Sequence, residues 1–268
     1  MKIGIIGGAG RMGQCISSLL AKDGFNVIIS DKDEEKLRKI KGARAESNAD
    51  LVKKSDLVLI SLPLGSLEEA AAEISPFVGE GQIILDISSL KEPSLEIMHK
   101  HLDKAIVLGV HPMFGPAIKD FNSEKFVLTP TDEREEKIAE KIGDYLVKKG
   151  ARVIVLSPKE HDDLMSVVLG LSHFVGLSVA TSLSRTDLKR LKEVSGPTFE
   201  ILLELVKSVV SQDPAFYASL QMNLPDLGRI ENDFFEQVKK WRELIKNKDE
   251  ENFVRHMKIL NKEIGALL

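Results

Sequence analysis

The 268-residue sequence predicts an α/β fold in its first half, a doubly wound parallel sheet, followed by an all-helical C-terminal domain. Two observations carry this prediction. Up to about residue 156, short apolar runs alternate with helical patterns, and the runs are nearly continuous rather than alternating with polar residues. Strands that are covered by helices on both faces have that pattern. Beyond this point only helical patterns remain.

The expected elements follow in chain order. The apolar runs predict five strands, at residues 2–7, 26–31, 56–62, 82–87 and 105–110. Helical patterns lie between them at 11–22, 34–40, 66–77 and 93–101. Two further strands, 126–129 and 152–156, flank a charged helix at 132–149. This βαβ rhythm is typical of a doubly wound sheet.

A strong helix start marks the predicted domain boundary. Ser157-Pro158-Lys159-Glu160 combines an N-cap serine, a proline at the first helical position and a capping-box glutamate. The helical patterns that follow are broken at Ser195-Gly196-Pro197 and near Pro225. The predicted domains are therefore 1–156 and 157–268.

Composition narrows the class of protein. The net charge of −4 gives no electrostatic reason to expect nucleic acid or an anionic membrane as a partner. No apolar run reaches the roughly 18 residues of a membrane span, and the first residues lack a signal-peptide pattern. The single cysteine, Cys15, fits a reducing compartment, so we expect a cytoplasmic protein. No group of Cys, His and carboxylate residues has metal-ligand spacing, and no metal is expected.

The first strand leads into a glycine-rich loop. Gly8-Ala9-Gly10-Arg11-Met12-Gly13 matches G-x-G-x-x-G, with a strand before it and a helix after it, as the dinucleotide-binding motif requires. The glycines allow a tight turn, close approach to the pyrophosphate and close helix–strand packing. A connecting loop without a nucleotide is the alternative interpretation. The predicted cofactor contacts are Gly8, Gly10, Arg11, Met12, Gly13, Asp31, Leu62 and Pro63.

Asp31 ends the second strand. An acidic residue at that place accepts hydrogen bonds from the ribose hydroxyls and repels a 2′-phosphate, which favours NAD over NADP. Lys32 argues for the alternative, because a cation there could bind a phosphate. The sequence therefore predicts a Rossmann-type domain that binds NAD.

A histidine and a hydroxyl follow neighbouring strands. The fifth strand leads into residues 109–116, which include His111, and the fourth leads into residues 86–91, which include Ser89. Because ligands bind at the carboxyl ends of parallel strands in such sheets, His111 and Ser89 form a candidate acid/base pair. A loop histidine bonded to the backbone is an equally weighted alternative.

Four segments of the sequence resemble a known family. The run His111-Pro112-Met113-Phe114-Gly115-Pro116, the preceding Asp86-Ile87-Ser88-Ser89-Leu90-Lys91, and the later Glu160-His161-Asp162 and Ser172-His173-Phe174 resemble prephenate dehydrogenases, most closely the archaeal-type monofunctional members. The resemblance implies oxidative decarboxylation of prephenate to 4-hydroxyphenylpyruvate with NAD as hydride acceptor, in tyrosine biosynthesis. It also implies that His111 accepts a hydrogen bond from the 4-hydroxyl and that Ser89 bonds in the same cluster.

The resemblance places a histidine and an aspartate of the helical domain near the substrate. Asp162 and His173 are eleven residues apart, which puts them on one face of an unbroken α-helix. The alternative is that Asp162 only stabilises the first turn of the helix and that His173 is a core histidine.

One position departs from the family pattern. The family binds the ring carboxylate with an arginine five residues before the Asp of its Asp-Pro pair, and this position is Ser208 here. Lys207, Lys91, Arg229 or a partner subunit could supply the cation instead. The predicted substrate-binding set is His173, Asp162, Ser208 and Lys207.

The helical domain carries a run at residues 199–206 that is too apolar for a solvent-facing helix, and the family forms homodimers through this domain. Alternatives are an arogenate dehydrogenase, a β-hydroxyacid or 6-phosphogluconate-type dehydrogenase, an F420-dependent reductase of NADP and an NAD-binding regulator. The absence of lysine between His161 and Ser184 argues against the second, and Asp31 disfavours the NADP reductase. If the protein were a non-catalytic NAD-binding regulator, His111 and Ser89 would have no evident function.

Overall fold

The computed structural model describes residues 1–40, 43–44 and 47–267. Its contacts divide the chain into two compact units. The first unit contains Met1–Met165 and Lys207–Leu224, and the second contains Ser166–Val206 and the chain from Pro225 onward. The division therefore falls within the first long helix of the second half, whereas the sequence predicts a domain boundary at the start of that helix.

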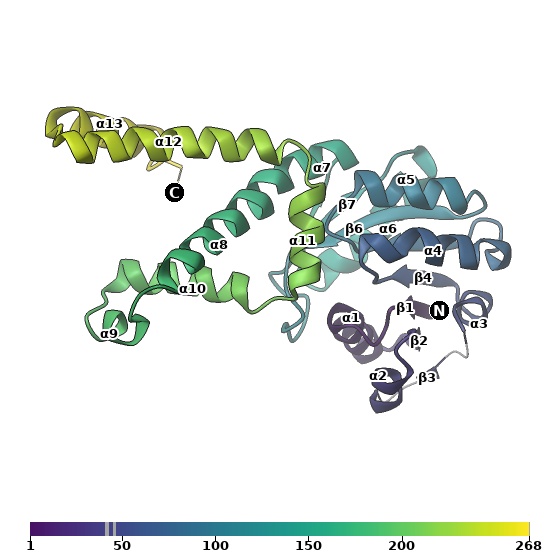
Figure 1. Cartoon of the computed structure of the whole chain (residues 1–268). Coiled ribbons are helices and arrows are strands. Elements are labelled where there is room, and N and C mark those ends of the chain that lie inside the picture. Colours follow the sequence, from purple (N-terminus) through teal and green to yellow (C-terminus); the bar gives the residue numbers. More distant parts are fainter. Residues whose placement is uncertain (41–42, 45–46, 268) are drawn as a thin grey trace. The chain divides into compact units, whose positions relative to one another are not determined.

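The first unit is built on one sheet with helices against it (Figure 1). Its strands are β1 (Lys2–Ile6), β2 (Asn26–Ser30), β3 (Ala43–Arg44), β4 (Leu57–Ile60), β5 (Ile83–Asp86), β6 (Ile106–Pro112), β7 (Lys125–Thr129) and β8 (Arg152–Val155). Over the described residues, these eight strands lie in the order β3-β2-β1-β4-β5-β6-β7-β8. This order confirms the predicted doubly wound arrangement, in which the chain starts at the middle of the sheet and extends it in both directions.

All five helices predicted before residue 156 are present, and two further helices, α7 and α11, belong to this unit. The seven helices are α1 (Arg11–Lys22), α2 (Glu34–Lys39), α4 (Leu64–Ile74), α5 (Glu92–His101), α6 (Glu133–Lys148), α7 (Pro158–Met165) and α11 (Pro214–Asn223). Helix α3 (Asn48–Lys54) was not predicted, although Ser47 caps it by accepting a hydrogen bond from the Asp50 backbone N–H (3.1 Å). Successive residues of the central strands face opposite cores, with Ile5 on one side and Ile6 on the other, as expected for strands covered on both faces.

The sheet is mixed rather than purely parallel. β7 runs antiparallel to β6, because residues 113–124 join the two strands without the helix that a parallel crossover uses. β6 is also longer than predicted, and His111 lies inside it, opposite Val127 of β7. The histidine is therefore held by strand pairing and not by a loop after the strand.

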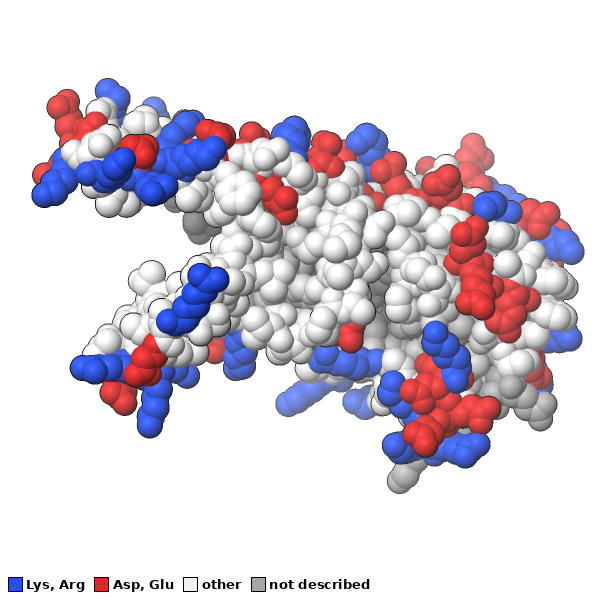
Figure 2. Space-filling model, viewed as in Figure 1, with Lys and Arg blue, Asp and Glu red and all other residues white. Residues whose placement is uncertain are grey.

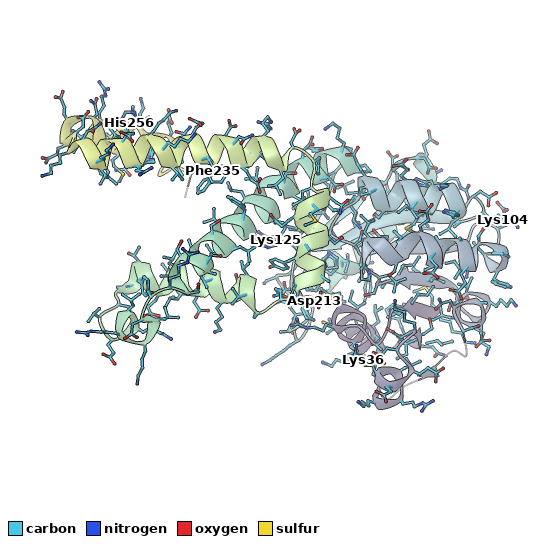
Figure 3. The ribbon with its side chains drawn as sticks, viewed as in Figure 1. Lys36, Lys104, Lys125, Asp213, Phe235 and His256 are labelled. Carbon is cyan, nitrogen blue, oxygen red and sulfur yellow. The ribbon has the colours of Figure 1, made fainter. Side chains whose placement is uncertain are left out.

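The second unit is helical, as predicted. It contains a π-helical segment, Ser166–Leu171, followed by α8 (Ser172–Leu183), α9 (Leu188–Glu193), most of α10 (Pro197–Val210), α12 (Leu227–Asn247) and α13 (Glu250–Glu263). α12 and α13 form an antiparallel pair, along which acidic and basic side chains are interspersed (Figures 1 and 2). Phe235 of α12 packs edge-on against Phe174 of α8, with ring centroids 5.6 Å apart (Figure 3).

The second unit exposes a large apolar surface. Within the described part of the chain, one helix, Pro158–Leu183, is long and apolar enough to cross a membrane by length and composition alone. No such helix was predicted, because no uninterrupted apolar run in the sequence reaches the length of a membrane span. Apolar side chains are exposed on α10 and α13 as well, with Ile201 at 73%. Exposed apolar surface on several helices is typical of a protein–protein interface.

Candidate active site

The glycine loop makes a close junction between β1 and α1. A Cβ atom on Gly13 would lie 2.3 Å from the carbonyl oxygen of Gly7, so only glycine lets the helix pack this close to the strand end. Gly7, which the motif does not include, takes the left-handed turn with a φ of 77°. No side chain caps the N-terminus of α1 at Gly10, which fits a site where backbone N–H groups bind phosphate.

Asp31 fixes the shape of this loop. Its Oδ2 accepts a hydrogen bond from the Ala9 backbone N–H (2.9 Å), and its Oδ1 accepts one from Asp33 (3.0 Å). Each carboxylate oxygen has a further lone pair, which leaves capacity for a ribose hydroxyl. Leu62 lies against the turn at Gly7, and Pro63 precedes α4.

The remaining predicted cofactor residues begin α1. Arg11 is exposed and Met12 is half-buried against the core. The glycine loop, the helix start and Asp31 together fit a nicotinamide dinucleotide. Among the residues that the structure describes, no group of three or more His, Cys, Asp or Glu residues could hold a metal ion.

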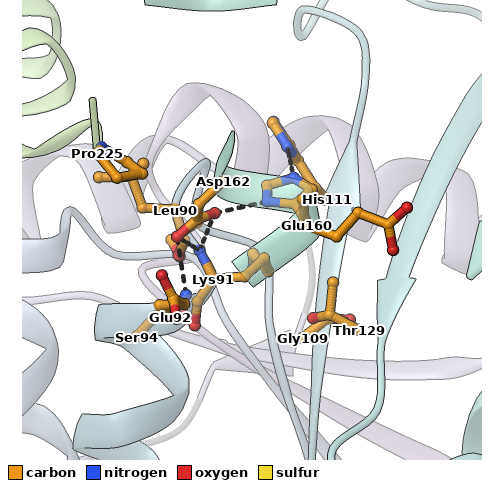
Figure 4. Close-up of polar contacts among 12 residues, drawn as sticks. Leu90, Lys91, Glu92, Ser94, Gly109, His111, Thr129, Glu160, Asp162 and Pro225 are labelled. Carbon is orange, nitrogen blue, oxygen red and sulfur yellow. Dashed lines mark hydrogen bonds and ion pairs between the residues drawn. The ribbon is translucent and has the colours of Figure 1, made fainter. Parts of the chain in front are cut away.

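A hydrogen-bonded chain of three buried side chains lies at the end of β6 (Figure 4). His111 Nδ1 is 2.8 Å from His161 Nε2, and His161 Nδ1 is 2.6 Å from Asp162 Oδ1. The last two residues belong to α7, whose start is fixed as predicted, since Ser157 Oγ accepts a hydrogen bond from the Glu160 N–H (3.2 Å). The chain thus joins residues that are fifty positions apart in the sequence.

The carboxylate of Asp162 is held by the N-terminus of α5. Oδ1 accepts a hydrogen bond from the backbone N–H of Lys91 (2.8 Å), and Oδ2 accepts one from Glu92 (2.9 Å). The Lys91 N–H is also 3.1 Å from Oδ2. Negative charge is favourable at this end of a helix, so α5 fixes the position of the carboxylate.

A buried ion pair supports the same region. Lys91 Nζ lies 2.5 Å from Asp86 Oδ2, and it also donates to the carbonyl oxygens of Asp86 (3.1 Å) and Val110 (3.2 Å). The hydroxyls of Ser88 and Ser94 donate to the same carboxylate oxygen of Asp86. All three protons of the ammonium are therefore used inside the protein, which removes Lys91 from the candidate cations for the substrate.

Burial controls the protonation of His111. It lowers the pKa of the imidazole well below the usual histidine value, and the positive charge of the nearby Lys91 lowers it further. His111 is therefore neutral near pH 7, and one of its ring nitrogens can accept a hydrogen bond.

The structure does not bring every predicted residue into this cluster. Ser89 is half-buried after β5, and no hydrogen bond between described residues joins it to His111. His173 belongs to the second unit, where burial lowers its pKa. His173 and Asp162 are not joined by the unbroken α-helix that their predicted shared face requires, because residues 166–171 between them are π-helical and turn by less than 100° per residue.

The remaining candidate cation positions are exposed. Lys207 and Ser208 are exposed on α10. Arg229 is exposed on α12 and lies 3.6 Å from Asp226 and 3.7 Å from Asp233. Asp213, the reference point for Ser208, caps α11 by accepting a hydrogen bond from the Phe216 N–H (2.8 Å; Figure 3).

His161 is the site residue that the sequence analysis missed. It stands in the segment Glu160-His161-Asp162 that carried the family resemblance, yet only Asp162 was given a role. The available signal was a histidine beside a carboxylate in the first turn of a helix, on a segment that follows directly from the last strand of the sheet.

Comparisons with known proteins agree with this architecture. The chain matches the models for the prephenate dehydrogenase nucleotide-binding domain over residues 16–155 and for the prephenate dehydrogenase dimerization domain over residues 157–259. A probable arogenate/prephenate dehydrogenase of Methanocaldococcus jannaschii is 33% identical over 99% of this chain and 61% of its own length. The T-protein of Enterobacter agglomerans is 30% identical over 82% of this chain and 56% of its own length.

The chain therefore spans less than two thirds of these two curated relatives. A solved structure has a similar fold over nearly its whole length: prephenate dehydrogenase from Aquifex aeolicus in complex with hydroxyphenyl propionate and NAD+. Its TM-score is 0.80 at 22% identity, over 100% of this chain and 98% of that one. With both domain models matched in order, the chain contains a nucleotide-binding domain followed by a dimerization domain, and it belongs to the prephenate dehydrogenase family.

Proposed function

We propose that the protein catalyses the oxidative decarboxylation of prephenate to 4-hydroxyphenylpyruvate, with NAD as hydride acceptor, in tyrosine biosynthesis. The observation that carries this proposal is the buried, neutral His111 at the carboxyl end of β6. Because β1, β4, β5 and β6 are parallel, His111 and the glycine loop are at the same edge of the sheet. Family membership supports the reaction class.

In the proposed reaction His111 accepts a hydrogen bond from the 4-hydroxyl of the substrate. The bound dinucleotide supplies the hydride acceptor. As hydride leaves C4, the polarised hydroxyl oxygen stabilises the positive charge that develops there. The bond between C1 and the ring carboxylate breaks, its electron pair aromatises the ring, and carbon dioxide leaves. The products are 4-hydroxyphenylpyruvate, carbon dioxide and the reduced dinucleotide.

The proposed cofactor is NAD rather than NADP. The carboxylate of Asp31 accepts a hydrogen bond from Ala9 of the glycine loop, so its negative charge is fixed where a 2′-phosphate would approach. We test substrate and cofactor together by measuring kcat/KM for prephenate and arogenate, each with NAD and with NADP. Prephenate with NAD is expected to give the highest value. A higher value with arogenate, or with NADP, would replace that part of the proposal.

The Ser208→Arg variant is expected to lower the KM for prephenate about 10- to 150-fold, because a charge-assisted hydrogen bond to the ring carboxylate contributes roughly 1.5–3 kcal/mol. Ser211→Arg, which adds the same charge three positions later at an exposed site, is the matched control and should leave KM unchanged. An unchanged or higher KM in Ser208→Arg would indicate that a different cation already binds the carboxylate.

The proposed assembly is a homodimer formed through the helical domain. The exposed apolar side chains of the second unit support this, because they form a surface that a second copy would cover. They include Val167, Val168, Ile201, Met257 and Leu260. A match to a dimerization domain over residues 157–259 supports the same assembly. The cytoplasm is the proposed location, and neither nucleic acid nor a membrane is a proposed partner.

A further inference from the structure

We infer that His161 and Asp162 act as positioning residues that keep the ring proton of His111 on Nδ1, so that Nε2 is always the hydrogen-bond acceptor. One part of the inference rests on the proposed function, namely that His111 Nε2 accepts the hydrogen bond from the substrate hydroxyl. The direction of the hydrogen-bonded series Asp162–His161–His111 follows from the contacts that two neutral histidine rings make.

The hydrogen-bonded series of side chains has a fixed end at Asp162, which the N-terminus of α5 holds. The backbone N–H groups of Lys91 and Glu92 can only donate, and the ionised carboxylate of Asp162 can only accept. The proton in the 2.6 Å contact between Asp162 and His161 therefore belongs to His161 Nδ1. No change of tautomer in either histidine can reverse this end of the chain.

The direction passes from one ring to the next. A neutral imidazole has one donor and one acceptor, so His161 with a proton on Nδ1 accepts at Nε2. The 2.8 Å contact to His111 then requires a proton on His111 Nδ1. His111 Nε2 is left with its lone pair. A free neutral histidine prefers the opposite tautomer, with the proton on Nε2, so the chain imposes a form that would otherwise be the minor one.

The surroundings of His111 agree with this arrangement. The charged groups near it are Lys91, which precedes α5, with its partner Asp86 at the end of β5, and Asp162 on α7. Its neighbour across the sheet on β7 is Val127, which is apolar. Within the described residues, His161 is the hydrogen-bond partner of His111.

The Asp162→Asn variant should reverse the donor and acceptor roles in the hydrogen bonds that link position 162, His161 and His111. An amide keeps both α5 N–H groups bonded only when its oxygen takes the place of Oδ2, which lies 2.9 and 3.1 Å from them. Its NH2 group then takes the place of Oδ1 and donates to His161 Nδ1. His161 must donate from Nε2 to His111 Nδ1, and the His111 proton moves to Nε2. The acceptor at Nε2 is lost, and kcat is expected to fall at least about 100-fold.

The test reads the tautomer directly by long-range ¹H–¹⁵N NMR of the histidine rings in the labelled full-length chain at about pH 8, without substrate. His111 is assigned by the signals that disappear in His111→Asn. The wild type should show a protonated Nδ1 and an unprotonated Nε2, and Asp162→Asn should show the reverse. Asp163→Asn is the matched control, because Asp163 is the next residue and pairs with exposed Lys159. It should keep the wild-type tautomer and kcat.

Three results would overturn the inference: a wild-type proton on His111 Nε2, an unchanged His111 tautomer in Asp162→Asn, or a reversed tautomer without loss of kcat. The wild-type spectrum decides the first of these even if the variant does not fold. A wild type with the expected tautomer but no turnover of prephenate would instead contradict the proposed function and leave the hydrogen-bonded chain in place.

Discussion

Replacing His111 with asparagine is expected to lower kcat for prephenate about 10²–10⁴-fold, the usual contribution of a positioned acid or base, while NAD binding is retained. His111 is buried and neutral, and it offers the proposed acceptor for the 4-hydroxyl. The asparagine side chain does not place a nitrogen lone pair there. The glycine loop and Asp31 contain no contact to His111 that the substitution would remove. Steady-state kinetics and NAD titration of the same preparation check both expectations.

His101→Asn is the matched control for this substitution. His101 is the last residue of α5, and its ring contacts exposed Glu68 at 3.3 Å, outside the site. It should keep the wild-type kcat. A His111→Asn variant with more than a tenth of the wild-type kcat would show that another group accepts the hydrogen bond.

The pH dependence follows from the direction of the His111 pKa. Protonation removes the acceptor, and the lowered pKa means that protonation occurs only below the ordinary histidine range of about 6.5. The acid limb of kcat/KM that reports His111 should therefore lie below about pH 6.5. An acid limb above that value would contradict the assignment of this group.

Replacing Lys91 with methionine is expected to lower the free energy of unfolding by about 3–5 kcal/mol, because removal of one partner leaves a buried charge uncompensated. Lys91 and Asp86 are both fully buried, and the carboxylate would keep the hydroxyl donors of Ser88 and Ser94 and the backbone N–H of Ser88 but no positive partner among the described contacts. The carbonyl oxygens of Asp86 and Val110 would also lose a donor. Chemical denaturation measures the change.

Two variants distinguish this explanation from a general effect of losing a lysine. Lys100→Met removes the lysine of an exposed ion pair with Glu68, and its denaturation midpoint should stay at the wild-type value. The double variant Asp86→Asn with Lys91→Met removes the stranded charge and should recover part of the stability. A Lys91→Met protein as stable as Lys100→Met would show that the buried pair is not needed.

Local patterns were enough to predict most of the fold. The glycine loop, α1 and the central strands depend on residues close together in sequence, and they appear where expected. The antiparallel direction of β7 depends on how residues 113–124 return the polypeptide to the sheet. The hydrophobic periodicity of the sequence contains no information about this path. The short strand β3 and the seven-residue α3 give patterns too brief to stand out, although Ser47 marked the helix start.

The site was predictable only in part, because its contacts join distant residues. His111 and Asp162 were identified, but the ring of His161 that links them became evident only from the contact between β6 and α7. Lys91 was a candidate cation for the substrate carboxylate, but its ammonium group pairs with the buried carboxylate of Asp86. The π-helical turn at 166–171 follows from backbone bonding that the α-helical period does not predict.

The most direct test of the proposed reaction is its stoichiometry. The purified full-length chain is mixed with prephenate and a limiting amount of NAD, and NADH, carbon dioxide and 4-hydroxyphenylpyruvate are measured in the same reaction. Equal amounts of the three products are expected, together with their loss in His111→Asn. Binding of NAD without turnover of prephenate or arogenate would contradict the account.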